Sequence, residues 1–271
     1  MTLTSTHELR TEGLAVGYGD RHVLTGLDLE IEPGTVTSIV GANACGKSTL
    51  LRSLSRLLTP TAGQVLLDGA SVHSMPAKRL ARVMGLLPQS PLSPDGITVA
   101  DLVGRGRHPH QRMFRAWSRE DDAAVAEALD ATQTAELADR PVDELSGGQR
   151  QRVWIAMVLA QGTDLLLLDE PTTFLDVSHQ IEVLDLLADL NRDRGTTIVI
   201  VLHDLNLAAR YSDRLVALEG GRVYASGPAD AVLTEQCVQD VFGLRSQIIR
   251  DPVSGGPLVV PVGRHHGGMP G

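Results

Sequence analysis

A short apolar segment runs directly into a glycine-rich loop near residue 40, and this junction constrains the fold more than any other feature of the chain. The segment is Thr35-Val36-Thr37-Ser38-Ile39-Val40, and its residues are nearly all of the types found in buried strands. The loop is Gly41-Ala42-Asn43-Ala44-Cys45-Gly46-Lys47-Ser48, and leucines recur at helical spacing over residues 47–58. The sequence therefore predicts a strand, a loop and a helix in immediate succession.

The loop matches the pattern G-x-x-x-x-G-K-[ST], in which backbone N–H groups and a helix N-terminus surround phosphates. Lys47 is expected on the β- and γ-phosphates, Ser48 supplies a hydroxyl to Mg²⁺, and Thr49 supplies another hydroxyl to the phosphates. The residues expected to bind the cofactor here are Gly41, Ala42, Asn43, Ala44, Cys45, Gly46, Lys47, Ser48 and Thr49.

Composition argues against several classes of protein. The chain has 271 residues, enough for one main domain with an inserted lobe. Its formal net charge of -9 argues against a nucleic-acid binder, which needs an excess of Lys and Arg. Two cysteines, Cys45 and Cys237, are too few for a disulfide framework, which favours a reducing, cytosolic compartment. No apolar stretch reaches the roughly 18 residues of a membrane helix. If the protein works at a membrane, another chain is therefore expected to anchor it there.

Strands and helices alternate along much of the chain. Residues 8–40 read as strands, and the apolar runs at residues 165–168 and 196–202 are each followed by a helical pattern. This alternation predicts a parallel sheet with ligand-binding loops at the carboxyl ends of its strands. Residues 99–137 show helices and no convincing strand, which predicts an inserted helical lobe. Residues 263–271 are expected to form a disordered tail.

Two carboxylates end the apolar run at residues 165–168, which is the Walker B pattern. A buried strand places Asp169 at its mouth, and we expect it close to Ser48, where it holds the Mg²⁺ shell. Glu170 is then placed to polarise the attacking water and to act as the catalytic base.

Two further polar residues follow apolar strands. His203 follows one such strand, from which an imidazole can contact the γ-phosphate and orient the water. Gln89 follows the strand at residues 83–87, where it can sense the γ-phosphate and Mg²⁺ and pass the change to the helical lobe. Taken alone, His203 would be interpreted as a core histidine and Gln89 as a surface glutamine. Their place in the series of motifs favours the catalytic roles.

The motif Leu145-Ser146-Gly147-Gly148-Gln149 is the most specific one in the chain. Ser146 and the two glycines open a helix and form a second anion site, a role compatible with a plain N-cap at Ser146. Together with the motifs described above, it makes the chain resemble an ABC-type ATPase subunit from about residue 8 to residue 250. In that family this motif closes over ATP held by the glycine loop of the other subunit. The resemblance therefore implies ATP and Mg²⁺ as cofactors and a homodimer around two ATP molecules.

The resemblance also implies an α/β fold with a P-loop NTPase (RecA-like) core, an antiparallel β subdomain and an inserted α-helical subdomain. Residues 1–262 would form a single ABC ATPase cassette, with the helical subdomain at about residues 90–160. Tyr18 matches the aromatic that stacks on adenine, and Asp176 matches a loop that contacts the opposite subunit; a helix N-terminal charge is the alternative for Asp176. These positions add Tyr18, Ser146, Gly147, Gly148, Gln149 and Asp176 to the expected cofactor-binding residues, and they make Ser48, Gln89 and Asp169 the expected metal ligands.

The phosphate loop departs from the family pattern at two positions. The family usually has Pro at the position of Ala42 and Gly at the position of Ala44. If Ala44 requires a positive φ, its Cβ would cost on the order of 1 kcal/mol and weaken nucleotide binding about fivefold. The alternative is that Ala44 is accommodated without any penalty.

Several stretches are similar to the iron-siderophore, haem and cobalamin importer branch, among them residues 45–52, 106–110 and 171–180. They imply an ATP-hydrolysing subunit that energises uptake of an iron-siderophore or related metal chelate. Its partners would be membrane permease subunits and, through them, a substrate-binding protein, and it would lie peripherally at the cytoplasmic face of the membrane. Haem and cobalamin are the alternative substrates. The basic loop at residues 105–119, with Phe114 and Trp117, suits a solvated loop or a permease contact better than nucleic acid.

Two other classes of function fit the sequence less well. A soluble ABC-type ATPase of translation or DNA repair usually fuses two cassettes or inserts a long coiled coil, and neither appears in the sequence. A non-enzymatic ATP-dependent scaffold would be expected to have lost Glu170 or His203, and both are present.

Overall fold

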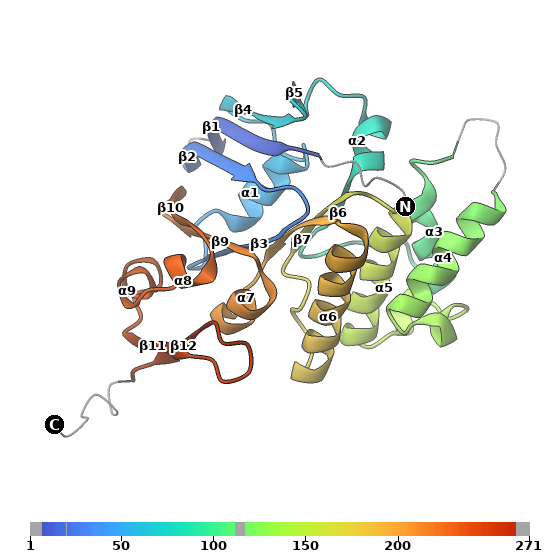
Figure 1. The fold of residues 1–271 in the computed structure, drawn as a ribbon. Helices are drawn as coiled ribbons and strands as arrows, with labels where there is room; N and C mark the ends of the chain where they lie inside the picture. Colours follow the sequence, from blue (N-terminus) through green and yellow to red (C-terminus); the bar gives the residue numbers. More distant parts are fainter. Residues whose placement is uncertain (1–6, 20, 112–116, 264–271) are drawn as a thin grey trace. The chain divides into compact units, whose positions relative to one another are not determined.

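The computed structural model describes residues 7–19, 21–111 and 117–263 (Figure 1). The chain divides into two compact units. We call Ser74–Ile200, to which His7 also belongs, the helical unit. Glu8–His73 and the chain from Val201 onward form what we call the phosphate-loop unit. The disordered tail was expected at residues 263–271, and all of it except Gly263 lies outside the described residues, as does Phe114 of the basic loop.

An antiparallel sheet forms the first part of the phosphate-loop unit, in the order β2-β1-β4-β5. Its strands are β1 (Leu9–Tyr18), β2 (Arg21–Ile31), β4 (Ala62–Leu67) and β5 (Ala70–Ser71). Buried and more exposed residues alternate along much of β1 and β2, as expected for strands with one face on a core. The strands predicted for residues 8–40 are therefore confirmed in type.

A second set of strands in the same unit has the order β10-β9-β3. β3 (Val36–Gly41) pairs in parallel with β9 (Arg214–Glu219), and β9 pairs antiparallel with β10 (Arg222–Gly227). All six residues of β3 are buried, which explains its continuous run of strand-forming residues. The helix α1 (Lys47–Leu54) follows β3 after the glycine loop, so the predicted strand, loop and helix are confirmed.

Several short elements complete the phosphate-loop unit. The helices are α7 (Leu205–Tyr211), α8 (Ala229–Val232) and α9 (Glu235–Phe242). The strands β11 (Ser246–Arg250) and β12 (Pro257–Pro261) form an antiparallel hairpin.

The strands of the helical unit are β6 (Met84–Leu87), β7 (Leu165–Asp169) and β8 (Thr197–Val201), whose last residue belongs to the other unit. β6 and β7 pair in parallel, with Leu87 opposite Leu168. All five residues of β7 are buried. The carboxyl ends of β6 and β7 therefore lie at the same edge, where Gln89 and Glu170 follow them.

Helices make up the rest of this unit. They are α2 (Ala77–Val83), α3 (Val99–Gly104), α4 (Arg119–Ala131), α5 (Gly147–Gln161) and α6 (Val177–Arg194), with three short 3-10 turns at Arg105–Arg107, Ala135–Leu137 and Val142–Glu144. α3 and α4 both pack on α5 (Figure 1). No strand occurs between residues 99 and 161 in the described part of the chain, as the helical lobe predicted there requires.

One predicted helix is shorter than expected. The leucine spacing predicted a helix through residue 58, but α1 ends at Leu54. Arg56 has a left-handed φ of 65°, and the N–H groups of Leu57 and Leu58 both donate to the Arg52 carbonyl, which closes the helix. Leu57 is accordingly 60% exposed and plays no part in the buried stripe.

Candidate active site

The glycine loop has a backbone that other residues could not adopt at two positions. Gly41 has a φ of 155°, and a Cβ there would lie 2.5 Å from the Leu218 carbonyl oxygen. Gly46 has a φ of 112°, and a Cβ there would lie 2.7 Å from the Leu24 side chain. Among the described residues no side chain caps the first turn of α1, so its N–H groups are placed to bind an anion.

The ammonium of Lys47 lies over this loop. It donates to the carbonyl oxygens of Gly41 and Ala42, at 2.9 Å in each case. The residue is only 5% exposed, and a buried ammonium is costly unless hydrogen bonds or an opposite charge compensate it. A phosphate bound in the loop would supply that charge.

Ala44 has a φ of 62°, in the left-handed region that favours glycine. Ala44 therefore has the positive φ on which the expected penalty depends. A residue with a Cβ occupies a backbone conformation in which a Cβ is unfavourable. The side chain of Ala44 is exposed. The strain consequently lies in the backbone of the loop itself.

Cys45 lies within the same loop, with its backbone N–H donating to the Ala42 carbonyl at 3.3 Å. Burial raises the pKa of its thiol above the ordinary value, although nearby Lys47 opposes the shift. The thiol is therefore protonated at neutral pH.

Asp169 and Glu170 are both buried at the end of β7, with exposures of 2% and 8%. Glu170 has a left-handed φ of 54°, a strained conformation of the kind that clusters at active sites. Its Oε2 accepts a hydrogen bond of 2.8 Å from Nε2 of Gln89, and Thr173 Oγ1 lies 3.4 Å from the same oxygen. The structure thus brings together two residues that the sequence separates by 81 positions.

Ser146 is the N-cap of α5, as expected. Its Oγ accepts from the Gln149 N–H at 3.2 Å, and Gln149 Oε1 accepts from the Ser146 N–H at 3.1 Å. The two glycines between them face a neighbouring loop: a Cβ on Gly148 would lie 3.4 Å from the Leu175 side chain, and one on Gly147 would lie 3.8 Å from Phe174, both ordinary van der Waals contacts. Ser146 and Gly147 themselves are exposed and accessible to a ligand.

A concave surface of about 390 Å³ lies beside this motif, lined by Ser146, Gly148, Gln149, Arg152, Phe174, Asp176 and His179. Phe174 has a left-handed φ of 70° and is 79% exposed, and Val177 is 75% exposed. Sequence reasoning singled out Asp176 in this segment and missed these two apolar residues. Their exposure depends on the turn before α6, for which the local sequence carries no clear signal.

Asp176 caps the N-terminus of α6. Its Oδ1 accepts from the His179 N–H at 3.0 Å, from His179 Nδ1 at 2.7 Å and from Ser178 Oγ at 2.9 Å. These hydrogen bonds, the backbone one first, hold the pKa of Asp176 below its ordinary value. In this structure Asp176 therefore has the alternative role, that of a charge at a helix N-terminus. Its carboxylate is also exposed.

His203 and Tyr18 both lie at the surface of the phosphate-loop unit. His203 is exposed between the end of β8 and the start of α7, where Leu202 N–H donates to the Ile39 carbonyl of β3 at 3.4 Å. Tyr18 ends β1 and is 47% exposed, so it does not fill the core.

Residues 24–173 match the ABC transporter family. The chain belongs to that family. It is 54% identical to the ferric enterobactin transport ATP-binding protein FepC of Escherichia coli (strain K12) over 260 residues, 96% of each chain. It is 53% identical to the petrobactin import ATP-binding protein FpuD of Bacillus anthracis over 256 residues, 94% of each chain. The structure of a metal-chelate type ABC transporter in an inward-facing conformation matches with a TM-score of 0.81 and 29% identity, covering 96% of this chain and 99% of that one.

Membership of the ABC family assigns a single activity, ATP binding and hydrolysis, to the motifs of both units. Its fold is the P-loop NTPase fold with an antiparallel β subdomain and a helical subdomain, as expected from the sequence. Over the described ranges, this ABC ATPase has no helix with the length and apolar character that crossing a bilayer demands.

Proposed function

We propose that this ABC ATPase energises the import of an iron-siderophore or related metal chelate through a separate permease, to which a substrate-binding protein delivers the chelate. The observation that carries the proposal is similarity along almost the whole chain to ATP-binding subunits of ferric enterobactin and petrobactin import. The ATPase would lie peripherally at the cytoplasmic face of the membrane, held there by the permease.

In this mechanism the loop from Gly41 to Ser48 binds the phosphates of ATP through its N–H groups and Lys47. Glu170 takes the proton of the attacking water, and the imidazole of His203 contacts the γ-phosphate and orients that water. Tyr18, exposed at the end of β1, stacks on the adenine.

The donor set suits Mg²⁺, which prefers hard oxygen ligands and keeps several waters and substrate phosphates in its shell. Ser48 would provide a hydroxyl, Asp169 a carboxylate and Gln89 its amide oxygen. The described residues hold no group of three or more His, Cys, Asp and Glu side chains able to bind a metal by themselves. When bound, Mg²⁺ neutralises charge on the phosphates.

The motif at residues 145–149 would complete the site of a second copy of the chain. Ser146 and Gly147 are exposed at the start of a helix of 15 residues, where a phosphate held by the partner can bind. Asp176, with the exposed side chains of Phe174 and Val177, would contact the same partner. Half of each active site then belongs to another subunit, so a monomer should hydrolyse ATP very slowly.

The loop at residues 105–119 would contact the permease. Its described part is tied to α2, because Lys78 donates to the Gln111 carbonyl and Arg82 Nε donates to the Pro109 carbonyl at 2.8 Å. Trp117 packs on the backbone of Gly104, where a Cβ would lie 3.0 Å from the ring. Truncation of the loop should therefore uncouple ATP hydrolysis from uptake, and unaffected uptake would remove the loop from the permease contact.

Uptake by a deletion strain of the source organism tests the proposed substrate. The strain should lose uptake of ferric siderophores and regain it with the wild-type chain but not with Glu170→Gln, while uptake of haem and cobalamin stays unchanged. Loss of haem or cobalamin uptake alone would assign the ATPase to that substrate and overturn the siderophore proposal.

A further inference from the structure

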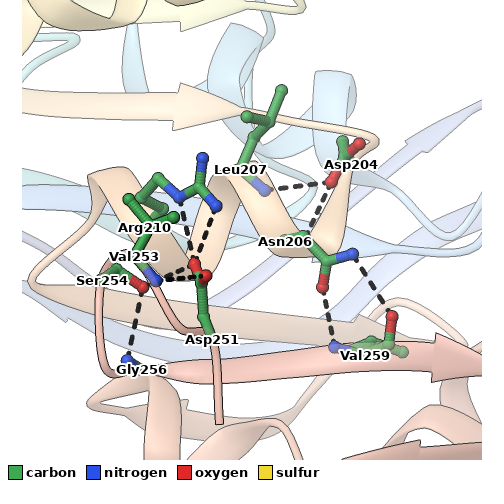
Figure 2. Close-up of polar contacts among 9 residues, drawn as sticks. All are labelled: Asp204, Asn206, Leu207, Arg210, Asp251, Val253, Ser254, Gly256 and Val259. Atoms are coloured by element: carbon green, nitrogen blue, oxygen red, sulfur yellow. Dashed lines mark hydrogen bonds and ion pairs between the residues drawn. The ribbon is translucent and has the colours of Figure 1, made fainter. Parts of the chain in front are cut away.

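The C-terminal hairpin lies against the helix that follows His203 (Figure 2). β11 and β12 pair from Ser246 opposite Pro261 to Arg250 opposite Pro257, and α7 contacts β12. A two-stranded hairpin is only marginally stable in water, and the seven residues of α7 are too few for a stable isolated helix. α7 also contacts β3, and β11 also contacts α9, so the hairpin is one of two supports that hold α7 in position.

The side chain of Asn206 joins the two elements, as Figure 2 shows. Its Oδ1 accepts from the Val259 N–H at 2.7 Å, and its Nδ2 donates to the Val259 carbonyl at 3.3 Å. One amide thus satisfies both backbone groups of a residue that is 5% exposed. Removing it would leave these groups without that partner, which is costly at a buried position.

Arg210 lies one turn further along α7 on the same side as Asn206. Its Nη2 and Nε donate to Oδ2 of Asp251, at 2.8 Å and 3.2 Å. Asp251 also accepts from the Val253 N–H at 3.0 Å and from Ser254 Oγ at 2.7 Å, which closes the turn of the hairpin. The ion pair is therefore built into the hairpin and anchors it to α7 at a second point.

Both neighbours of His203 in the sequence are anchored. Asp204 is the N-cap of α7, and its Oδ1 accepts from the N–H groups of Asn206 at 2.8 Å and Leu207 at 3.0 Å. Leu202 donates to the Ile39 carbonyl in β3. The backbone of His203 is consequently set by β3 on one side and by α7 on the other.

We propose that the C-terminal hairpin positions His203 for ATP hydrolysis through α7, with Asn206 and the Arg210–Asp251 pair as positioning residues. The proposal rests on the role assigned to His203 above. A hairpin that no longer holds α7 would let the imidazole move, and small displacements of a catalytic group lower the rate strongly. The phosphate loop would be unaffected, so ATP binding should persist while turnover falls.

A kinetic double-mutant cycle tests this proposal. The full chain is assayed at one high protein concentration as wild type, Asn206→Ala, His203→Ala and the double variant, with single-turnover assays for the slow ones. Asn206→Ala should lower kcat about tenfold with KM for ATP within about twofold of the wild type. In the His203→Ala background the same substitution should cause no further loss.

Two further variants keep the test interpretable. Asn206→Asp retains the acceptor for the 2.7 Å hydrogen bond and should recover part of kcat. Tyr224→Phe removes a 2.6 Å hydrogen bond to Asp240 in the same unit, leaves the hydrogen bonds of Asn206 and Arg210 in place, and should leave kcat unchanged. Asn206→Ala loses a buried hydrogen-bond partner and should melt below Tyr224→Phe. It should still be fully folded at the assay temperature and keep the ATP affinity of Tyr224→Phe, which separates a local displacement from general unfolding.

The outcomes separate the two claims. Unchanged kcat in Asn206→Ala, or an equal loss in the His203→Ala background, would overturn the positioning role while leaving His203 catalytic. Unchanged kcat in His203→Ala would overturn the role of His203 and the positioning proposal with it.

Discussion

The side-chain amide of Gln89 donates a hydrogen bond of 2.8 Å to the carboxylate of Glu170. Gln89 follows β6 and Glu170 follows β7, so the parallel pairing of these strands places both at one edge. The residue that leads into the helical lobe therefore contacts the proposed catalytic base directly. A movement of that lobe can reach the carboxylate through a single hydrogen bond.

Replacing Gln89 with Glu should change the pH dependence of ATP hydrolysis. Two carboxylates at hydrogen-bond distance cannot both ionise easily, because each negative charge disfavours the other. A general base must be ionised, and the acidic limb of the kcat profile should therefore move to higher pH. Gln89→Met, which removes the hydrogen bond without adding charge, is the matched control, and an unmoved limb in Gln89→Glu would argue against Glu170 as the base.

Glu170→Gln should preserve ATP binding and lower kcat by about 10²–10⁴-fold, because the amide cannot accept the proton of water. ATP would then remain bound between two copies of the chain. Size-exclusion chromatography with ATP should show a dimer for this variant and mostly monomer for the wild type. Full turnover in Glu170→Gln would refute the assignment of the base.

Ala44→Gly should tighten ATP binding about fivefold, because it relieves a backbone strain of about 1 kcal/mol. Ala42→Gly is the control, since Ala42 is not among the described residues with a positive φ and has no such strain to relieve. Isothermal titration calorimetry would compare the three proteins. Equal affinities would mean that the loop accommodates Ala44 without penalty, which is the alternative left open by the sequence.

Asp251 should make stability depend on acid pH. Hydrogen bonds from Val253, Ser254 and Arg210 hold the pKa of its carboxyl well below the ordinary value in the folded chain. A group with a depressed folded pKa stabilises the fold above its unfolded pKa, and that contribution disappears as pH falls through the folded pKa. Asp251→Asn should therefore unfold at lower denaturant than the wild type at pH 7, with the difference shrinking below about pH 4. A difference that stays constant down to acid pH would contradict this account.

The buried strands and the motifs that follow them were predictable because their signals are local. β3 and β7 are continuous runs of strand-forming or apolar residues, and the glycine pattern with Lys47 and Ser48 has a narrow chemical meaning. Contacts between distant segments were not predictable in the same way. The Gln89–Glu170 hydrogen bond depends on the register of β6 on β7, which neither segment specifies alone.

The C-terminal hairpin illustrates the same limit. Ser246–Arg250 mixes polar and apolar residues, and β12 begins and ends with proline, so the local pattern is weak. Its position is set by Asn206 and Arg210, which lie about 40 to 53 residues away in sequence. Similarly, α1 ends at Leu54 because the chain turns at Arg56, although the leucine spacing continues to residue 58.

Simultaneous measurement of ATP hydrolysis and ferric-siderophore uptake tests the central claim most directly. The chain is assembled with its permease in vesicles, and the substrate-binding protein is supplied with radioactive iron bound to the siderophore. The account predicts that uptake requires ATP, that hydrolysis rises with loaded binding protein, and that Glu170→Gln abolishes both. Uptake that continues in Glu170→Gln, or hydrolysis in the wild type that moves no chelate, would contradict it.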